Sequence, residues 1–251
     1  MRRRALTLME LVVVASITLV LASIVLVSLA QVRSTTRGFI CKNNLKTVAF
    51  EFAQFADGTT SPNRGESNRF GRRGFRIEDF QEKLYHIDEF WKGPKTGETE
   101  YLASDGPLIC PTVQGKLRRM YGLACSEYAV GPSRNVSIGF NMRLDRASRQ
   151  ILSRWVLEPV LLTDRILQHI SVPIAFDVDG SLADDLGTPP YYSAPPAGDP
   201  GKYGSGRYWF PGTRHNQKMN AVFVGGHVLS SGRPENEPGW NWRYQPPPSG
   251  Y

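Results

Sequence analysis

The side chains best suited to metal chemistry lie in the last third of the chain. His215 and His227 flank an apolar run, and Asp177 or Asp179 could join them as further ligands. Zinc and copper sites need three or four converging ligands, and no third ligand stands at a diagnostic spacing from the two histidines. We therefore interpret both histidines as structural residues and predict no transition-metal site.

The acidic segment DVDGSLADD is a candidate calcium loop, because Ca²⁺ prefers carboxylate oxygens. Its register does not fit an EF-hand: with Gly180 at the sixth position, the twelfth is Leu186, which offers no carboxylate. A calcium site stays a hypothesis, and otherwise no cofactor is expected. The candidate ligands are Asp177, Asp179, Asp184 and Asp185.

The chain has three cysteines, Cys41, Cys110 and Cys125, so at most one disulfide can form within it. Their spacing matches neither a zinc motif nor a redox Cys-x-x-Cys pair. Cys110 and Cys125 are candidates for a disulfide in an oxidising compartment. Cys41 lies on an apolar helical stripe and is interpreted as a packed thiol.

Motifs typical of enzymes are not found in the sequence, including G-x-S-x-G, H-E-x-x-H, the phosphate-binding Gly-Lys loop and G-x-G-x-x-G. Its Ser, His and Asp residues cannot be assembled into a triad from spacing alone. The net charge is +7, but basic residues beyond Arg2–Arg4 are scattered or interleaved with acidic ones. We therefore expect neither an enzyme nor a nucleic-acid partner.

An uncharged run from Leu11 to Val32 follows three arginines at the N-terminus. As a helix at 1.5 Å per residue this run is about 33 Å long, enough to cross a bilayer. By the positive-inside rule, Arg2, Arg3 and Arg4 keep the N-terminus in the cytoplasm, and the rest of the chain lies outside. The polar interruptions can bond to the helix's own carbonyls. They are Ser16, Thr18, Ser23 and Ser28.

Glu10 is an acid at the edge of this apolar run. An unpaired acid in hydrocarbon costs about 2.5 to 3.5 kcal/mol on insertion scales, so Glu10 is predicted to have a partner. A secretory signal cleaved at Ser28-Leu29-Ala30 would need a shorter apolar core and would include Glu10 within it. A plain membrane anchor explains the length of the run and the arginines, but it leaves Glu10 unexplained.

The third interpretation accounts for Glu10. The stretch ALTLME, preceded by arginines and followed by an apolar helix, resembles the prepilin-type signal of type IV pilins and type II secretion pseudopilins. This resemblance implies cleavage between Ala5 and Leu6 and N-methylation of Leu6. It makes Glu10 the fifth mature residue, in an assembly segment with Thr7 and Leu8. Ala5 and Leu6 stand where the family usually has Gly and Phe.

The resemblance also implies a function. Glu10 of one subunit would pair with the new α-amine of a neighbour and so set the register of assembly. The expected partners are a prepilin peptidase, other pilin-like subunits and the bacterial inner membrane, which the chain crosses once with its globular domain in the periplasm. The chain would be a structural subunit of a type II secretion pseudopilus or a type IV pilus. The alternative is a membrane-anchored or exported binding domain, for a glycan or another surface, that uses the leader only for export.

Beyond the apolar run, apolar residues recur at spacings of three and four, which predicts a one-sided helical stripe that ends at Asp57-Gly58. We therefore expect one helix over residues 6–56, transmembrane over 6–32 and then amphipathic, after a basic leader of residues 1–5. The stripe consists of Cys41, Leu45, Val48, Phe52 and Phe55.

The remaining chain predicts a pilin-like α+β fold, in which the long helix packs on a mainly antiparallel β-sheet domain with long loops. This domain is expected over 57–236, before a Pro-rich tail over 237–251. Gly225-Gly226 predicts a hairpin with a two-residue turn, and the apolar spacing within 146–156 predicts a second helix.

The segment RHNQKMNAVFVGGHV resembles the signature of a bacterial family that joins prepilin-type leaders to a domain named for a His, nine residues, Asp-Gly pattern. His215, Gly226 and His227 match that pattern, whereas Gly225 replaces the signature Asp. Cys110 and Asp177 lie in further matching segments. The replacement at Gly225 removes any role that the Asp has beyond shaping the turn.

Overall fold

The structure is a computed structural model. It describes residues 8–58, 74–87, 89–90, 99–101, 106–113, 115–120, 129–131 and 133–246. The chain divides into two compact units, Met1–Phe39 and Ile40–Tyr251.

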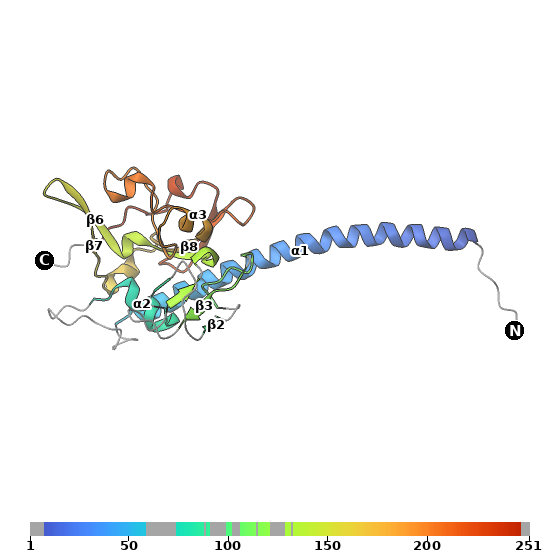
Figure 1. The fold of residues 1–251 in the computed structure, drawn as a ribbon, viewed down its shortest axis with the longest axis horizontal. Coiled ribbons are helices and arrows are strands. Elements are labelled where there is room, and N and C mark those ends of the chain that lie inside the picture. Colours follow the sequence, from blue (N-terminus) through green and yellow to red (C-terminus); the bar gives the residue numbers. More distant parts are fainter. Residues whose placement is uncertain are drawn as a thin grey trace. The chain divides into compact units, whose positions relative to one another are not determined.

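The helix α1 runs from Leu8 to Ala56 (Figure 1) and ends where the sequence predicts. The uncharged run from Leu11 to Val32 belongs to the first unit, and the described side chains of this run are exposed. The predicted bonds from hydroxyl groups to the helix's own carbonyls are confirmed. They are Ser16 to Val13 at 2.8 Å, Thr18 to Ala15 at 2.9 Å, Ser23 to Val20 at 2.7 Å and Ser28 to Ile24 at 2.9 Å.

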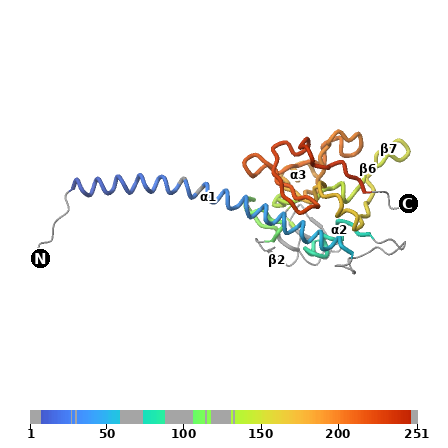
Figure 2. The backbone as a smooth tube through the Cα atoms, turned by 180° about the vertical axis from the view of Figure 1, so that it is seen from behind, coloured from blue at the N-terminus to red at the C-terminus, as the bar shows by residue number. Residues whose placement is uncertain are grey.

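In the second unit, α1 buries the predicted stripe, and all five of its members are at most 2% exposed. The short helix α2 (Ile77–Tyr85) lies beside this part of α1 (Figure 2). Phe52 and Phe80 meet edge to face with ring centroids 5.4 Å apart. This aromatic contact belongs to the core of the globular unit.

The largest sheet has five strands in the order β11-β10-β8-β5-β9, and β8 is its central strand. Every residue of β8 and β10 is buried, as expected of central strands with continuous apolar runs. Only β9 pairs in parallel in this sheet. The strands are β5 (Ile138–Asn141), β8 (Pro173–Asp177), β9 (Tyr192–Ser193), β10 (Met219–Phe223) and β11 (Val228–Ser231).

A second sheet has four short strands in the order β1-β4-β3-β2, in which only β1 and β4 run parallel. A helix of six residues, α3 (Gly180–Asp185), follows β8. The predicted α+β class, with a long N-terminal helix and a mainly antiparallel sheet domain, is therefore confirmed. The four strands are β1 (Glu89–Phe90), β2 (Thr99–Tyr101), β3 (Arg118–Met120) and β4 (Ala129–Gly131).

The prediction of a helix over 146–156 is wrong. The strands β6 (Arg146–Ile151) and β7 (Arg154–Pro159) form an antiparallel hairpin there. Its two turn residues, Leu152 and Ser153, have φ of 46° and 62°, the left-handed backbone of a type I′ turn. Neither is the Gly or Asn that usually marks such a turn, so no turn signal stands at these positions and the apolar spacing favours a helix.

The hairpin of β10 and β11 forms as predicted, but its turn is longer than two residues. Gly226 N donates to Phe223 O and Phe223 N donates to His227 O, which leaves three residues in the loop. Gly226 has φ of 80°, whereas Gly225 has no positive φ. The loop is a turn followed by one left-handed glycine.

The Pro-rich tail predicted from residue 237 is partly packed. Trp240 and Trp242 are 8% and 2% exposed and belong to the core. The indole of Trp242 donates to the carbonyl of Pro234 at 2.7 Å. Residues 247–251 lie outside the described part of the chain.

The burial of α1 predicts a position-specific loss of stability. Phe52→Ala should lower the free energy of unfolding by about 3 to 5 kcal/mol, because it leaves a cavity in the core. Phe50→Ala, on the same helix at a side chain that is 64% exposed, should change it by less than about 0.5 kcal/mol. Urea unfolding of the full chain in detergent measures both values, and equal losses would contradict this packing.

Candidate functional site

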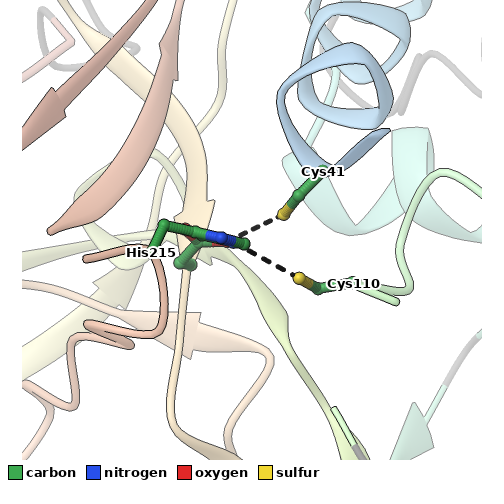
Figure 3. Close-up of side chains that lie close together, drawn as sticks. Cys41, Cys110 and His215 are labelled. Carbon is green, nitrogen blue, oxygen red and sulfur yellow. Dashed lines mark hydrogen bonds and ion pairs between the residues drawn. The ribbon is translucent and has the colours of Figure 1, made fainter. Parts of the chain in front are cut away.

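Four metal-ligating side chains from separate segments of the globular unit converge at one point, labelled in part in Figure 3. Cys41 lies on α1, Asp177 ends β8, and Cys110 and His215 come from loops. Their ligand atoms all lie within 4.8 Å of one another, and this is the one such group among the described residues. We call Cys41, Cys110, Asp177 and His215 the donor cluster.

The contacts within the donor cluster are direct. Cys41 Sγ donates to Asp177 Oδ1 at 3.2 Å, and Cys110 Sγ lies 3.4 Å from His215 Nε2. The same Nε2 lies 3.6 Å from Asp177 Oδ2. Cys41, Cys110 and Asp177 have no exposed surface, and the His215 side chain is 11% exposed, so only the imidazole of the cluster reaches bulk water.

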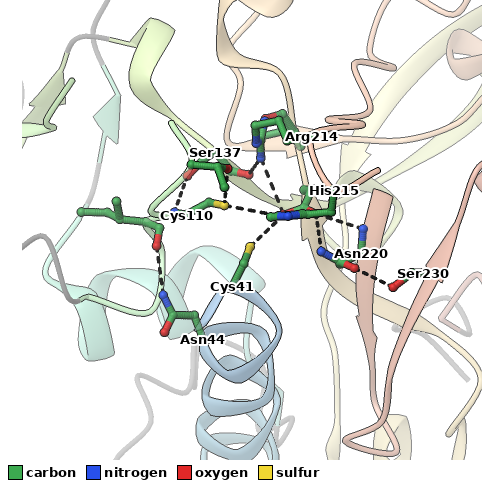
Figure 4. Close-up of polar contacts among 12 residues, drawn as sticks. Cys41, Asn44, Cys110, Ser137, Arg214, His215, Asn220 and Ser230 are labelled. Atoms are coloured by element: carbon green, nitrogen blue, oxygen red, sulfur yellow. Dashed lines mark hydrogen bonds and ion pairs between the residues drawn. The ribbon is translucent and has the colours of Figure 1, made fainter. Parts of the chain in front are cut away.

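The loop that carries Cys110 is held by two hydrogen bonds (Figure 4). Asn44, one turn after Cys41 on α1, donates its amide to the carbonyl of Ile109 at 2.9 Å. The backbone N–H of Cys110 donates to the hydroxyl of Ser137 at 2.8 Å. These bonds bring the Cys110 thiol next to the buried face of α1.

Asp177 and His215 are held by groups around β8. The backbone N–H and the side-chain amide of Asn220 both donate to Asp177 Oδ2 at 2.9 Å. Arg214 donates to the carbonyls of Val178 and Ser137, each at 2.6 Å, and lies 3.6 Å from Asp177 Oδ1. Arg214 is therefore held against the central strand β8, and this fixes the position of the neighbouring His215 imidazole.

The electrostatics of the donor cluster favour one charged thiol. Hydrogen bonding between the two thiols lowers the pKa of Cys110 and raises that of Cys41, which also donates to Asp177. The hydrogen bond with Cys110 raises the pKa of His215. Burial raises the pKa of Asp177, and the charges of Arg214 and His215 oppose that effect. These contacts therefore favour the thiolate at Cys110 over Cys41, and the thiolate is the metal-binding and nucleophilic form.

The geometry of the donor cluster differs from that of a Cys-His-Asp triad. In a triad the two imidazole nitrogens face different partners, one the nucleophile and the other the carboxylate. Here Nε2 of His215 faces both Cys110 and Asp177. All the donor atoms point at one another, which is the arrangement of ligands around a common centre.

The four members of the donor cluster stand out in the sequence one by one, but their spacing does not predict that they meet. His215 is predicted as a structural histidine and Cys41 as a packed thiol. The available signal was that Cys110, Asp177 and His215 all lie in segments that carry the family resemblance. Cys110 is a free thiol in the structure, and Cys125 lies outside the described residues, so their pairing stays a prediction.

Each of the four candidate calcium ligands has a partner within the protein. Asp177 belongs to the donor cluster, and Asp179 caps α3 by accepting from the N–H groups of Ser181 and Leu182. Asp184 and Asp185 both form ion pairs with Arg134. Among the described residues these four carboxylates do not form a group that could hold one ion.

The other signature residues shape the hairpin of β10 and β11. His227 is exposed and stacks on Phe223 with ring centroids 4.6 Å apart. Gly225 packs closely on Ile170, because a Cβ at Gly225 would lie 3.0 Å from the Cβ of Ile170. His227 and Gly225 therefore lie outside the donor cluster.

The N-terminal site residues fall partly within the described chain. Leu8 and Glu10 lie in the first turn of α1, where the helix dipole favours a carboxylate. Ala5, Leu6 and Thr7 lie outside the described residues. Cleavage, methylation and assembly at these positions stay predictions.

A pocket of about 240 Å³ lies apart from the donor cluster. Tyr191, Tyr192 and Tyr208 contribute to its wall, together with Asp145 and Arg146. Asp145 is 1% exposed, and burial raises the pKa of its carboxyl to about 6 although Arg146 opposes the shift.

Asp145 predicts a pH dependence of stability. Its pKa in the folded chain, about 6, is above the ordinary value of 3.8. The stabilisation from its protonation is therefore fully present below pH 3.8 and lost as the pH rises through about 6. This loss of stability lowers the unfolding midpoint as the pH rises. Asp145→Asn should make that decrease smaller, and Asp164→Asn, at an exposed carboxylate, should leave the decrease unchanged. Equal slopes in all three proteins would exclude Asp145 as the source.

No protein-family model, curated protein or solved structure matches the chain. A function can be inferred from two features, the exposed apolar part of α1 and the donor cluster.

Proposed function

We propose that the chain is a prepilin-like structural subunit that a prepilin peptidase processes and that joins a type II secretion pseudopilus or type IV pilus-like filament. The observation that supports this proposal is the apolar part of α1. This helix is long and apolar enough to cross a membrane, and no residue of its most apolar window is buried in the structure. Such a surface needs lipid or other helices around it.

The arginines at the N-terminus support an orientation for this helix. Arg2, Arg3 and Arg4 precede the apolar run and favour a cytoplasmic N-terminus in the bacterial inner membrane. The unit Ile40–Tyr251 then lies on the periplasmic side. The chain crosses the membrane once. It can then move from the membrane into a filament only if its helix exchanges contacts with lipid for contacts with other subunits.

Glu10 supports assembly over simple anchoring. It lies in the first turn of α1, next to a uniformly apolar helical surface. Cleavage after Ala5 creates an α-amine on Leu6, four residues before Glu10, and the Glu10 of a neighbouring subunit can pair with that amine. In a low-dielectric bundle such an ion pair is strong only when both partners are in place, so it selects one register. Head-to-tail contacts of this kind do not close and generate a filament.

The N-terminal sequence and mass of the protein from membranes of its native host test this proposal. A chain that begins at methylated Leu6 supports prepilin processing. A chain that begins at Gln31 indicates ordinary signal cleavage, and an intact Met1 leaves only an anchor. Either of the last two results overturns the proposal and favours an anchored or exported binding domain.

A substitution at Glu10 separates assembly from anchoring. Glu10→Ala and Glu10→Gln should each abolish incorporation into filaments, because neither can pair with the α-amine, while the chain still inserts into the membrane. Ser16→Ala, in the same exposed apolar run, should assemble normally, because the Ser16 hydroxyl bonds only within its own helix. Immunoblots of sheared filaments and of membranes measure both properties. Normal assembly of the Glu10 variants would contradict the proposed register.

A further inference from the structure

We infer that the donor cluster, Cys41, Cys110, Asp177 and His215, binds one Zn²⁺ ion as a closed structural centre. The four side chains supply two sulfur, one nitrogen and one oxygen ligand. Thiolate and imidazole ligands together favour Zn²⁺, which structural sites hold with four protein ligands. This inference concerns the globular unit and goes beyond the proposed role of α1 in assembly.

The spacing of the donor atoms fits a tetrahedral ion. Bond lengths of about 2.3 Å to sulfur and about 2.0 to 2.1 Å to nitrogen or oxygen place neighbouring ligand atoms roughly 3.3 to 3.8 Å apart. The contacts Cys41 to Asp177, Cys110 to His215 and His215 to Asp177 measure 3.2, 3.4 and 3.6 Å. The remaining separations do not exceed 4.8 Å, so closure around the ion requires movements of at most about 1 Å.

The charges of the centre balance when a divalent cation is present. Two thiolates and the Asp177 carboxylate carry three negative charges in a region with almost no exposed surface. Arg214, 3.6 Å from Asp177, supplies one positive charge, and a divalent ion supplies the other two. Binding displaces the proton that Cys41 donates to Asp177 and leaves no uncompensated buried charge.

The groups around the donors resemble the outer shell of a metal site, which orients the ligands. Asn220 fixes Asp177 with two hydrogen bonds, and its own side-chain oxygen accepts from Ser230 at 2.6 Å (Figure 4). Ser137 accepts from the backbone of Cys110, and its carbonyl accepts from Arg214. The ligands are therefore already positioned by bonds that a metal would not disturb.

The position of the centre indicates a structural role. Its ligands join α1 to the end of the central strand β8 and to two loops, and Cys41 and Asp177 are 136 residues apart in sequence. With four protein ligands and no exposed thiol, the centre leaves no open position for a substrate. A metal here would fix the second part of α1 against the five-stranded sheet.

Metal analysis of the full chain tests the inference. The protein is purified in detergent without chelators, and its metal content is measured by elemental mass spectrometry. We expect about one zinc ion per chain. Cys41→Ser and His215→Ala should each lose this zinc. His227→Ala, at the other signature histidine, should keep it, because His227 stacks on Phe223 outside the cluster.

A second measurement uses the unsubstituted chain, so its result does not depend on whether the variants fold. Replacement of the metal by Co²⁺ should give the intense visible absorption of a tetrahedral thiolate site. Chelation should make the Cys41 and Cys110 thiols reactive to alkylation and lower the unfolding midpoint. Protein that holds no zinc and takes up neither Zn²⁺ nor Co²⁺ overturns the inference. A disulfide of Cys110 in the native protein, with Cys41 or with Cys125, overturns it as well.

Discussion

The Asp177 carboxylate, buried at the end of the central strand, is the constraint around which the globular unit is arranged. A charged group without exposed surface must be paired on every side, because its desolvation is otherwise too costly. Asn220 of β10, Arg214 and His215 of the loop before β10, and Cys41 of α1 all contact it. The hydrogen bonds and ion pairs to the Asp177 carboxylate therefore join α1, the five-stranded sheet and the loops.

The helix α1 meets two different demands along its length. Its second part contributes a stripe of core residues from Leu45 to Phe55, and its first part buries nothing in the described structure. A helix with apolar residues on one side packs that side against a core. A helix that is apolar on every side packs against lipid or other helices. The proposed filament role depends on the first part, and the proposed zinc centre depends on the second.

The elements that local patterns specify could be predicted from the sequence. The spacing of Leu45, Val48 and Phe52 predicted the buried face of α1, and Gly225-Gly226 predicted the hairpin of β10 and β11, although not the length of its loop. The hairpin of β6 and β7 could not be predicted, because Leu152 and Ser153 take left-handed backbone without a Gly or Asn signal. The donor cluster could not be predicted either. Its members meet only through tertiary packing, which no spacing rule describes.

The burial of Trp240 and Trp242 near the end of the chain has a consequence for biogenesis. The core also contains Phe52 of α1, so its completion requires residues from both ends of the globular unit. If α1 anchors the chain as proposed, translocation must therefore deliver the residues up to Trp242 before this core can be completed. A chain that stalls before Trp240 leaves Phe176 and Phe223 without their contacts to Trp242 and Trp240, and such exposed core residues attract chaperones and proteases. If the proposed function holds, only subunits exported as far as Trp242 would be available for assembly.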